Sequence, residues 1–435
     1  MAEFFKLRNQ IKHYEWGSPD CIPRLMGMAN NDGRPWAELW MGSHPAAPSM
    51  VNVDGNETSL GSLIAGNPEY WLGKRCAEQY GGLPFLFKLL AAGKPLSIQA
   101  HPNRAQAQEG FERENRAGLA ADAPNRNYKD ANHKPEIICA ITPFTGMCGF
   151  RPPAEIRRLL EAFLAPASTA GTVPATATAS AAETAPAPLR EGFVPLLQTL
   201  DTADTGAALR NFLGVLFGLS AGLRKELTGF ILSQGHKGAA AGSIAGDADS
   251  GVSPAQWELM LRFAQLYPND PALIAPLYLN TFRLEPGEAI FLRAGVLHAY
   301  MSGLGVELMA NSDNVLRGGL TPKHIDVPEL MKVLDFSPLR PEILKARSSP
   351  ALFRYPADCG EFSLAAMRGE GDETAFAETG PAICVVTEGE LQITDTGGGE
   401  TILKPGESIF IPAGAGRPLR FSGNFALYVA TLPVT

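Results

Sequence analysis

Four side chains in three separate segments of the chain could bind one metal ion. In the segment from Ser97 to Pro102, Gln99 and His101 are two residues apart, so an extended strand projects both from the same face. Glu136 and His298 lie in two further segments and add a carboxylate and a second imidazole. Two neutral imidazoles and one carboxylate are a usual ligand set for a catalytic zinc, and an amide oxygen adds a neutral, hard ligand. This set suggests Lewis-acid chemistry on an oxygenated substrate.

Composition limits the classes of partner. The formal net charge of −8 and the pI of about 5.5 argue against nucleic acid or an anionic membrane, because both attract a positive surface. The N-terminal residues lack a positive leader followed by an apolar core, and no apolar run approaches the ~18 to 20 residues of a membrane span. The six cysteines include no C-x-x-C pair, which favours reduced, mostly buried thiols. We therefore expect a cytoplasmic protein with no nucleic-acid or membrane partner.

The elements that must position the four side chains change character along the chain. The 435 residues exceed one ordinary domain of roughly 100 to 200 residues, so we expect two or three units. Residues 1–150 alternate short apolar segments with Gly and Pro turns, which predicts an all-β unit. The stretch between Arg104 and Ala131 is charged and poorly patterned, and its path is left open.

Helical patterns begin after residue 150. Pro152 and Pro153 precede an apolar stripe with i, i+3, i+4 and i+7 spacing from Ile156, and a second stripe runs over residues 209–216. Ser253 and its following residues resemble a capping box that opens a third helix. Residues 151–266 therefore predict a helical insertion. Two low-complexity tracts within it, residues 165–188 and 237–251, predict mobile surface loops.

An internal repeat predicts that one β module occurs twice. The sixteen residues from Leu284 align with the sixteen from Leu403 at a constant offset of 119, and eight positions are identical. Each copy reads as a Pro-Gly turn, an apolar strand and a second glycine turn, the hairpin pattern of a small barrel. Arg417 stands in the second copy where the first has His298, and no histidine follows His324. The C-terminal module therefore lacks an imidazole for a metal.

The chain resembles the type I mannose-6-phosphate isomerases, a zinc-dependent cupin family. The resemblance runs nearly end to end and includes the two segments that hold Gln99, His101 and Glu136. Its other motifs are Tyr14-Glu15-Trp16-Gly17, residues 37–45, Leu83-Pro84-Phe85-Leu86-Phe87-Lys88 and, as the most specific, the segment from Gly305 to Lys323.

The resemblance implies a mainly β fold with a helical insertion: two cupin-like jelly-roll barrels and an α-helical domain. The expected units are a catalytic cupin from residues 1–150 and 267–335, the insertion 151–266, and a C-terminal cupin-like domain 336–435 without metal ligands. The implied function is reversible isomerisation of mannose 6-phosphate and fructose 6-phosphate through an enediolate, which supplies GDP-mannose synthesis. The implied cofactor is one Zn²⁺ per chain, the partner a sugar phosphate, and the state a monomer.

The resemblance also implies roles for the site residues. The expected metal ligands are Gln99, His101, Glu136 and His298. The expected catalytic residues are Lys134, Tyr300, Glu307, Asp313 and Arg317. The expected substrate-binding residues are Trp16, Glu38, Lys88, Ser97, His133 and Lys323, with Lys88 and Ser97 on the phosphate. Either Lys134 or Glu307 could be the base, the first if its pKa is depressed by burial and the metal, the second if its surroundings are apolar.

Other interpretations stay open at the level of sequence. Lone histidines are more often hydrogen-bonded structural residues than ligands, and His133 could steer substrate, support the metal from behind or lie on the surface. The two imidazoles and one carboxylate also permit an iron or manganese oxygenase or decarboxylase of the same barrel type. A third possibility is a sugar-phosphate-binding protein without catalytic activity.

Overall fold

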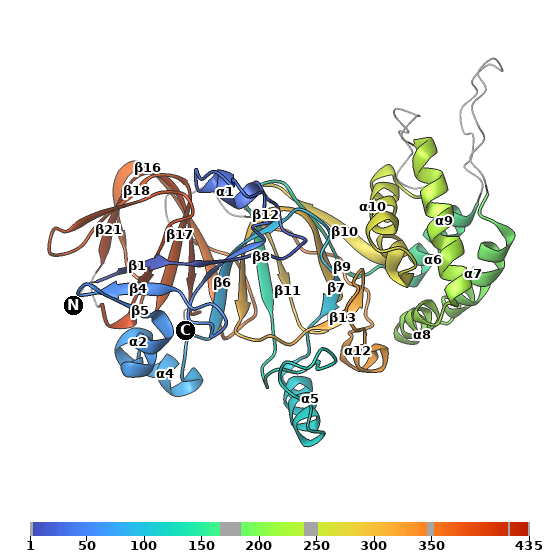
Figure 1. Ribbon diagram of the computed structural model, residues 1–435, viewed down its shortest axis with the longest axis horizontal. Coiled ribbons are helices and arrows are strands. Elements are labelled where there is room, and N and C mark those ends of the chain that lie inside the picture. The colour runs from blue at the N-terminus through green and yellow to red at the C-terminus, as the bar shows by residue number, and fades with distance from the viewer. Residues whose placement is uncertain (1–2, 166–183, 239–250, 346–351, 416–417, 434–435) are drawn as a thin grey trace, which may run out of the picture.

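The computed structural model describes residues 3–165, 184–238, 251–345, 352–415 and 418–433. Two antiparallel sheets lie side by side and a group of helices stands at one end (Figure 1). The expectation of a mainly β protein with helices is confirmed. The greater part of the two low-complexity tracts, and position 417 of the repeat, lie outside the described residues.

The first sheet has eleven strands and contains every expected metal ligand or its neighbour in sequence. Its main path runs β14-β11-β8-β12-β6-β3-β2, and β7, β9, β10 and β13 pair beside it. The strands are β2 (Gln10–Lys12), β3 (Glu38–Met41), β6 (Phe85–Ala92), β7 (Ile98–Ala100), β8 (Glu136–Ala140), β9 (Phe144–Phe150), β10 (Leu279–Leu284), β11 (Glu288–Leu292), β12 (His298–Ala310), β13 (Leu316–Gly319) and β14 (Leu344–Lys345).

The second sheet has ten strands, mostly from the C-terminal part of the chain. Its strands are β1 (Phe5–Arg8), β4 (Met50–Val53), β5 (Asn56–Ser59), β15 (Phe353–Arg354), β16 (Ser363–Phe376), β17 (Ala382–Gly389), β18 (Leu391–Thr394), β19 (Glu400–Leu403), β20 (Ser408–Ile411) and β21 (Leu419–Thr431). The N-terminal strand β1 pairs with β20, with Phe5 opposite Phe410. The first residues of the chain therefore complete the C-terminal sheet.

Helices follow residue 150, where the apolar stripes predicted them. They are α6 (Pro153–Leu164), α7 (Ala187–Thr199), α8 (Thr205–Phe217), α9 (Ala221–Gly238) and α10 (Pro254–Leu266), followed by η1 (Pro271–Ile274) and α11 (Ala275–Tyr278). The capping box at the start of α10 is confirmed, since the Ser253 hydroxyl accepts from the Gln256 N–H and the Gln256 side chain accepts from the Ser253 N–H. Apolar residues of one face of α6, among them Ile156, Leu160 and Phe163, are buried in the core that these helices share with the first sheet.

The expectation of only β structure before residue 150 was wrong. This part also contains α1 (Cys21–Leu25), α2 (Leu60–Gly66), α3 (Pro68–Leu72), α4 (Lys74–Tyr80) and α5 (Arg104–Arg116), and later come α12 (Val327–Val333) and η2 (Ala413–Ala415). Helix α5 begins with a second capping box, formed by Asn103 and Gln106. Few of its residues are buried, so its sequence lacks the apolar stripe that marked the other helices.

Alternate residues of the central strands of the first sheet point to two different sides. One side packs against the second sheet, and the other faces the interior cavity. On β6, Phe85, Phe87 and Leu89 pack into the core shared with the second sheet, whereas Lys88 lies on the opposite face. On β8, Ile137 and Cys139 join the same shared core, whereas Glu136 faces the interior. Each of these strands is buried on both faces, and the interior face carries the polar side chains of Lys88 and Glu136.

Among the described residues, no single helix is long and apolar enough to cross a membrane. In that part of the chain only the pair α8 and α9 reaches the required length and composition, and the two helices are bent by 94° relative to each other.

Candidate metal centre and substrate cavity

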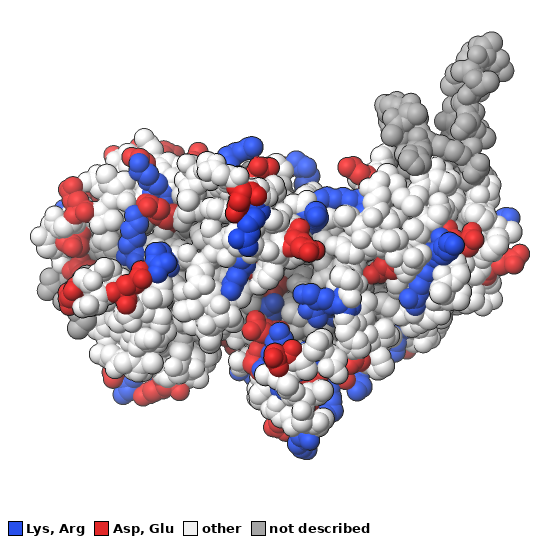
Figure 2. Space-filling view, in the orientation of Figure 1, with Lys and Arg blue, Asp and Glu red and all other residues white. Residues whose placement is uncertain are grey.

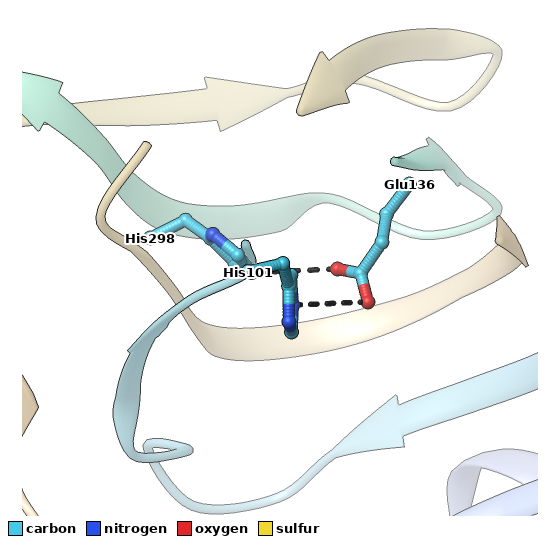
Figure 3. Close-up of side chains that lie close together, drawn as sticks. All are labelled: His101, Glu136 and His298. Atoms are coloured by element: carbon cyan, nitrogen blue, oxygen red, sulfur yellow. Dashed lines mark ion pairs between the residues drawn. The ribbon is translucent and has the colours of Figure 1, made fainter. Parts of the chain in front are cut away.

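Strand register brings the four expected metal ligands to one place. Gln99 of β7 lies directly opposite His298 of β12 on one side and Arg317 of β13 on the other. His101 follows the end of β7, and Glu136 is the first residue of β8, which pairs with β12. The ligand atoms of His101, Glu136 and His298 all lie within 4.8 Å of one another, and their side chains point toward one another (Figure 3).

The hydrogen bonds of the two imidazoles fix which ring nitrogen faces the cluster. Nδ1 of His101 lies 2.7 Å from the carbonyl oxygen of Asn314, and Nδ1 of His298 lies 2.9 Å from that of Val296. A carbonyl oxygen can only accept, so each ring carries its proton on Nδ1. The Nε2 atoms therefore turn lone pairs toward the two carboxylate oxygens of Glu136, each at 3.3 Å.

This cluster of acceptors fits a cation. Nε2 of His101 and Oε2 of Glu136 are buried and have no hydrogen-bond partner among the described residues, a state that costs free energy unless an ion or proton lies between them. Burial first, and the charge of Lys134 second, lower the pKa of His101 to about 4. Its ring is therefore neutral at pH 7 and ready to act as a ligand. Two imidazoles and one carboxylate are the donor set that catalytic zinc uses.

Gln99 completes the set only after a small side-chain change. Its Nε2 lies 3.4 Å from Nε2 of His298. Rotation of the amide about its last side-chain bond exchanges nitrogen for oxygen at this position, and the oxygen is the atom that could bind a metal. Lys134 lies behind the carboxylate, with Nζ 3.0 Å from Oε1 of Glu136. Burial alone raises the pKa of Glu136, but the positive charge of Lys134 opposes this, and the pKa is lowered well below its usual value.

Asn314, which the sequence reasoning did not select as a site residue, ties one imidazole to the loop before β8. It is fully buried. Its backbone carbonyl accepts from His101, while its side-chain oxygen accepts from the N–H groups of Lys129, at 2.7 Å, and Asp130. Its side-chain nitrogen donates to the carbonyl oxygens of Asp130 and Asn132, at 2.8 and 2.9 Å. In the sequence Asn314 is the last of four consecutive polar residues, Asn311 to Asn314, and this pattern alone does not distinguish its role.

Substituting Asn314→Ala is expected to lower zinc affinity by about 10-fold to 100-fold, as loss of groups that orient metal ligands typically does. The change removes the side-chain hydrogen bonds that hold the loop, so the carbonyl on His101 loses its fixed position. Competition with a chelator of known affinity measures the change. Asn311→Ala is the matched control, because the Asn311 side chain lies in the same segment and, among the described residues, bonds only to the carbonyl of Leu83. Equal zinc affinity in the two variants would contradict the prediction.

A second polar group, of one lysine and two carboxylates, lies on neighbouring strands. Lys88 is opposite Glu307 in the register, and its Nζ lies 2.9 Å from Oε2 of Glu307 and 3.3 Å from Oε1 of Glu38. The indole N–H of Trp40 donates to the other oxygen of Glu38 at 2.6 Å. Burial raises the pKa of Glu307, and Lys88 offsets this only in part. Burial opposes the charge on Lys88, but Glu307 and Glu38 outweigh it and raise the pKa of the lysine.

Glu136 of the metal cluster and the second polar group line one cavity of about 1150 Å³, whereas His101 and His298 are not among its lining residues. Of the residues expected at the site, those that line it are Trp16, Glu38, Lys88, Ser97, Gln99, Lys134, Glu136, Tyr300, Glu307, Asp313, Arg317 and Lys323. The insertion and the segment after it contribute the wall from Leu266 to Pro271. The structure therefore places most of the expected site residues around one space.

Three cations form a basic part of this cavity. Arg317, Lys323 and Lys129 all line it, and within the described part of the chain none of them makes an ion pair. Burial, and then the charges of Arg317 and Lys129, lower the pKa of Lys323, which reflects their proximity. Burial likewise lowers the pKa of Arg317. Cations without a carboxylate partner beside a cavity suit an anion such as a phosphate.

Three expected residues have particular surroundings. The hydroxyl of Tyr300 is buried without a hydrogen-bond partner among the described residues, and burial followed by the charge of Glu307 raises its pKa well above the usual value. Asp313 is half exposed and lies 3.4 Å from Nε2 of His44, and this contact lowers its pKa. His133 does not line the large cavity; it lies in a second cavity beside Glu361.

Charge over the outer surface is mixed. On the face shown in Figure 2, basic and acidic side chains are interspersed, and no continuous basic field covers it. This is consistent with the net charge of −8 and gives no large positive surface on that face for nucleic acid.

Comparisons with known proteins agree on one family. Residues 4–153 match the family described as phosphomannose isomerase type I, catalytic domain. The chain is 37% identical over 411 residues to mannose-6-phosphate isomerase of Escherichia coli, covering 94% of each protein. It is 38% identical over 424 residues to that of Salmonella typhimurium, covering 96% of this chain and 97% of the relative. A solved structure described as mannose 6-phosphate isomerase, holo and zinc bound, superposes with a TM-score of 0.83 at 35% identity and full coverage of both chains.

Proposed function

Because the chain belongs to the type I mannose-6-phosphate isomerase family, we propose how its own residues bind the substrate and move the proton. The reaction is the zinc-dependent interconversion of D-mannose 6-phosphate and D-fructose 6-phosphate, which supplies mannose 6-phosphate for GDP-mannose synthesis. It requires a proton to pass between C2 and C1 while negative charge develops on the adjacent oxygens. The site must therefore hold the sugar, stabilise that charge and supply a base.

In the proposal, His101, Glu136 and His298 hold the zinc ion and Gln99 is the fourth protein ligand. When bound, zinc supplies Lewis-acid stabilisation of the oxygen that becomes negative. The observation that carries this assignment is that Nε2 of His101 and Oε2 of Glu136 are buried acceptors with no hydrogen-bond partner among the described residues. Nζ of Lys134 lies 3.0 Å from Oε1 of Glu136 and restrains that carboxylate. Lys134 also lines the cavity, where its positive charge would contact the sugar oxygens.

Glu307 is the proposed base. Its carboxylate is buried and lines the cavity, and burial raises its pKa, which makes it a better proton acceptor than an exposed carboxylate. Lys88, at 2.9 Å, favours the ionised form that a base needs. Lys88 was expected on the phosphate, but its ammonium already contacts two carboxylates. We assign it to Glu307 instead.

The phosphate is proposed to lie among Arg317, Lys323 and Lys129, with Ser97 as a hydroxyl donor. Three cations that make no ion pair with the described residues can balance a phosphate dianion, which Lys88 cannot do as well because it already pairs with a carboxylate. Arg317 also lies opposite Gln99 in the sheet. Its guanidinium could therefore stabilise the negative charge that develops near the metal. Trp16, stacked on Tyr14 with ring centroids 5.7 Å apart, would line the sugar together with Glu38.

The finer organisation is also part of the proposal. Each sheet would curl into a cupin-like barrel, with a catalytic unit of residues 1–150 and 267–335, the insertion 151–266 and a C-terminal unit 336–435 that β1, β4 and β5 complete. Gly287 and Gly406, equivalent positions of the repeat, have φ values of 85° and 83°, which supports a duplicated module. A monomer in the cytoplasm completes the proposal.

The test is turnover of mannose 6-phosphate in an assay coupled to fructose 6-phosphate formation. Chelation of metal is expected to abolish turnover, and added Zn²⁺ is expected to restore it, because the acceptor cluster needs a cation. Binding of mannose 6-phosphate without turnover in zinc-replete protein would contradict the function and indicate a sugar-phosphate-binding protein. Restoration by Fe²⁺ or Mn²⁺ but not by Zn²⁺ would contradict the metal assignment.

A further inference from the structure

A second cavity, of about 600 Å³, lies apart from the metal centre and contains one buried carboxylate. That carboxylate belongs to Glu361, in the loop between β15 and β16 of the second sheet, and its side chain is 9% exposed. No part of the proposed function uses Glu361. The loop itself is fixed, because the Tyr80 hydroxyl donates to the carbonyl of Gly360 at 2.9 Å and the thiol of Cys359 donates to Oε2 of Glu361 at 3.1 Å.

The other oxygen of Glu361 contacts the start of helix α5 and the loop before β8 at once. Its Oε1 lies 2.9 Å from Nε2 of His133, and it also accepts from Nη2 of Arg104. Arg104 and His133 are 3.0 Å apart at the same atoms. One carboxylate oxygen from the C-terminal part of the chain therefore joins two residues that are 29 positions apart in sequence.

These two residues flank the metal ligands symmetrically. Arg104 follows His101 by three positions, and His133 precedes Glu136 by three positions. Each connection contains a proline, Pro102 in the first and Pro135 in the second. Proline fixes its own φ, so a short connection through it transmits the position of one end to the other. The contact at Glu361 thus restrains the separation of the segments that carry His101 and Glu136.

The charge of Glu361 is suited to a permanent contact. Burial alone would raise its pKa, but hydrogen bonds from His133 and Cys359 and the charges of His133 and Arg104 outweigh it and lower the pKa to about 2. The carboxylate therefore stays ionised over the range in which the protein is expected to work. Its position, rather than its titration, is the feature that matters.

We propose that Glu361 is a positioning residue of the metal centre, by which the C-terminal unit holds the His101 and Glu136 segments at the separation that binds zinc. This inference rests on the proposed zinc site. The C-terminal unit contains no histidine, because none follows His324. The inference nevertheless gives this unit a part in positioning the metal ligands. It also explains why His133 lies outside the substrate cavity although it is one residue from Lys134.

The experiment compares Glu361→Gln with Glu378→Gln. Glu378 is a matched control because it is a C-terminal carboxylate with a 5% exposed side chain that pairs with Arg354 at 2.6 Å, within the second sheet unit. Glutamine keeps the shape of each side chain and removes its charge. Zinc affinity is measured by chelator competition, and the stability of each metal-free variant is measured by denaturant unfolding.

Glu361→Gln is expected to bind zinc about 10-fold more weakly than the unaltered protein, at the low end of the effect of partners that orient ligands, while Glu378→Gln binds it normally. Unaltered zinc affinity in Glu361→Gln would overturn the inference. Equal losses of zinc affinity in both variants would also overturn it, since they would indicate a general loss of stability. Failure of the unaltered protein to bind zinc would instead overturn the proposed function, together with any inference that rests on it.

Discussion

Substituting Glu136→Gln is expected to lower zinc affinity by more than ~100-fold and to abolish isomerisation at limiting zinc, since loss of a ligand should exceed the loss caused by outer partners. Glu136 is the only carboxylate of the His101, Glu136 and His298 cluster, and both of its oxygens lie 3.3 Å from an imidazole nitrogen. Glutamine retains the shape but removes the negative charge that a dication needs. Metal content after dialysis and turnover with and without added Zn²⁺ measure the effect.

The control for this variant is Glu38→Gln. Glu38 is also buried in the same cavity and also pairs with a buried lysine, so general damage to a buried ion pair would affect both variants. The expected result is that Glu38→Gln retains its zinc. Retention of zinc and activity by Glu136→Gln would show that the cluster is not the metal centre, whereas equal loss in both variants would indicate that the ion pairs serve folding.

Substituting Glu307→Gln is expected to lower kcat by about 10²-fold to 10⁴-fold, the usual contribution of a general base. A glutamine amide cannot accept the proton from the sugar carbon. The same variant should lose exchange of the C2 proton of mannose 6-phosphate with deuterated solvent, which NMR measures independently of product formation. Zinc content should be unchanged, because Glu307 is not among the described metal-capable cluster.

The pH dependence adds a second measurement. Burial raises the pKa of Glu307, and a base acts only when ionised, so kcat should fall as the pH decreases through that raised pKa. This acidic limb should disappear in the residual activity of Glu307→Gln. Glu38→Gln again serves as control, since it removes the other carboxylate on Lys88. If Lys134→Met abolishes C2 exchange while Glu307→Gln retains it, Lys134 is the base.

Local chemistry explains what could be predicted from sequence. The two-residue spacing of Gln99 and His101 predicted that both face one point, although β7 ends at Ala100 and His101 follows it, and the capping box at Ser253 marked the start of α10. The repeat predicted equal Pro-Gly turns, and Gly287 and Gly406 have nearly the same φ. These features depend on neighbours within a few residues, so the chain carries the whole signal.

The helix α5 shows where such reasoning stops. Its capping box at Asn103 was present in the sequence, but the helix buries few residues and therefore has no apolar stripe. The role of Lys88 was likewise decided by residues far away, since its partners Glu38 and Glu307 are 50 and 219 positions distant. The sequence could indicate that Lys88 belongs to the site, but not that its ammonium contacts Glu38 and Glu307 instead of a phosphate.

The sequence by itself determined the residue types at the site, the helices that follow residue 150 and the family to which the chain is similar. The tertiary structure alone decided which atoms face one another. His298 and Glu307 are nine positions apart on β12, and in a regular strand an odd spacing puts two side chains on opposite faces. An irregularity between Tyr300 and Ser302 shifts the alternation by one residue, so that both side chains can face the same side. Such a shift depends on pairing with β9, and Glu361 reaches the ligand segments only through the packing of the two sheets. Pairing and packing join residues across hundreds of positions, so no local pattern could have shown them.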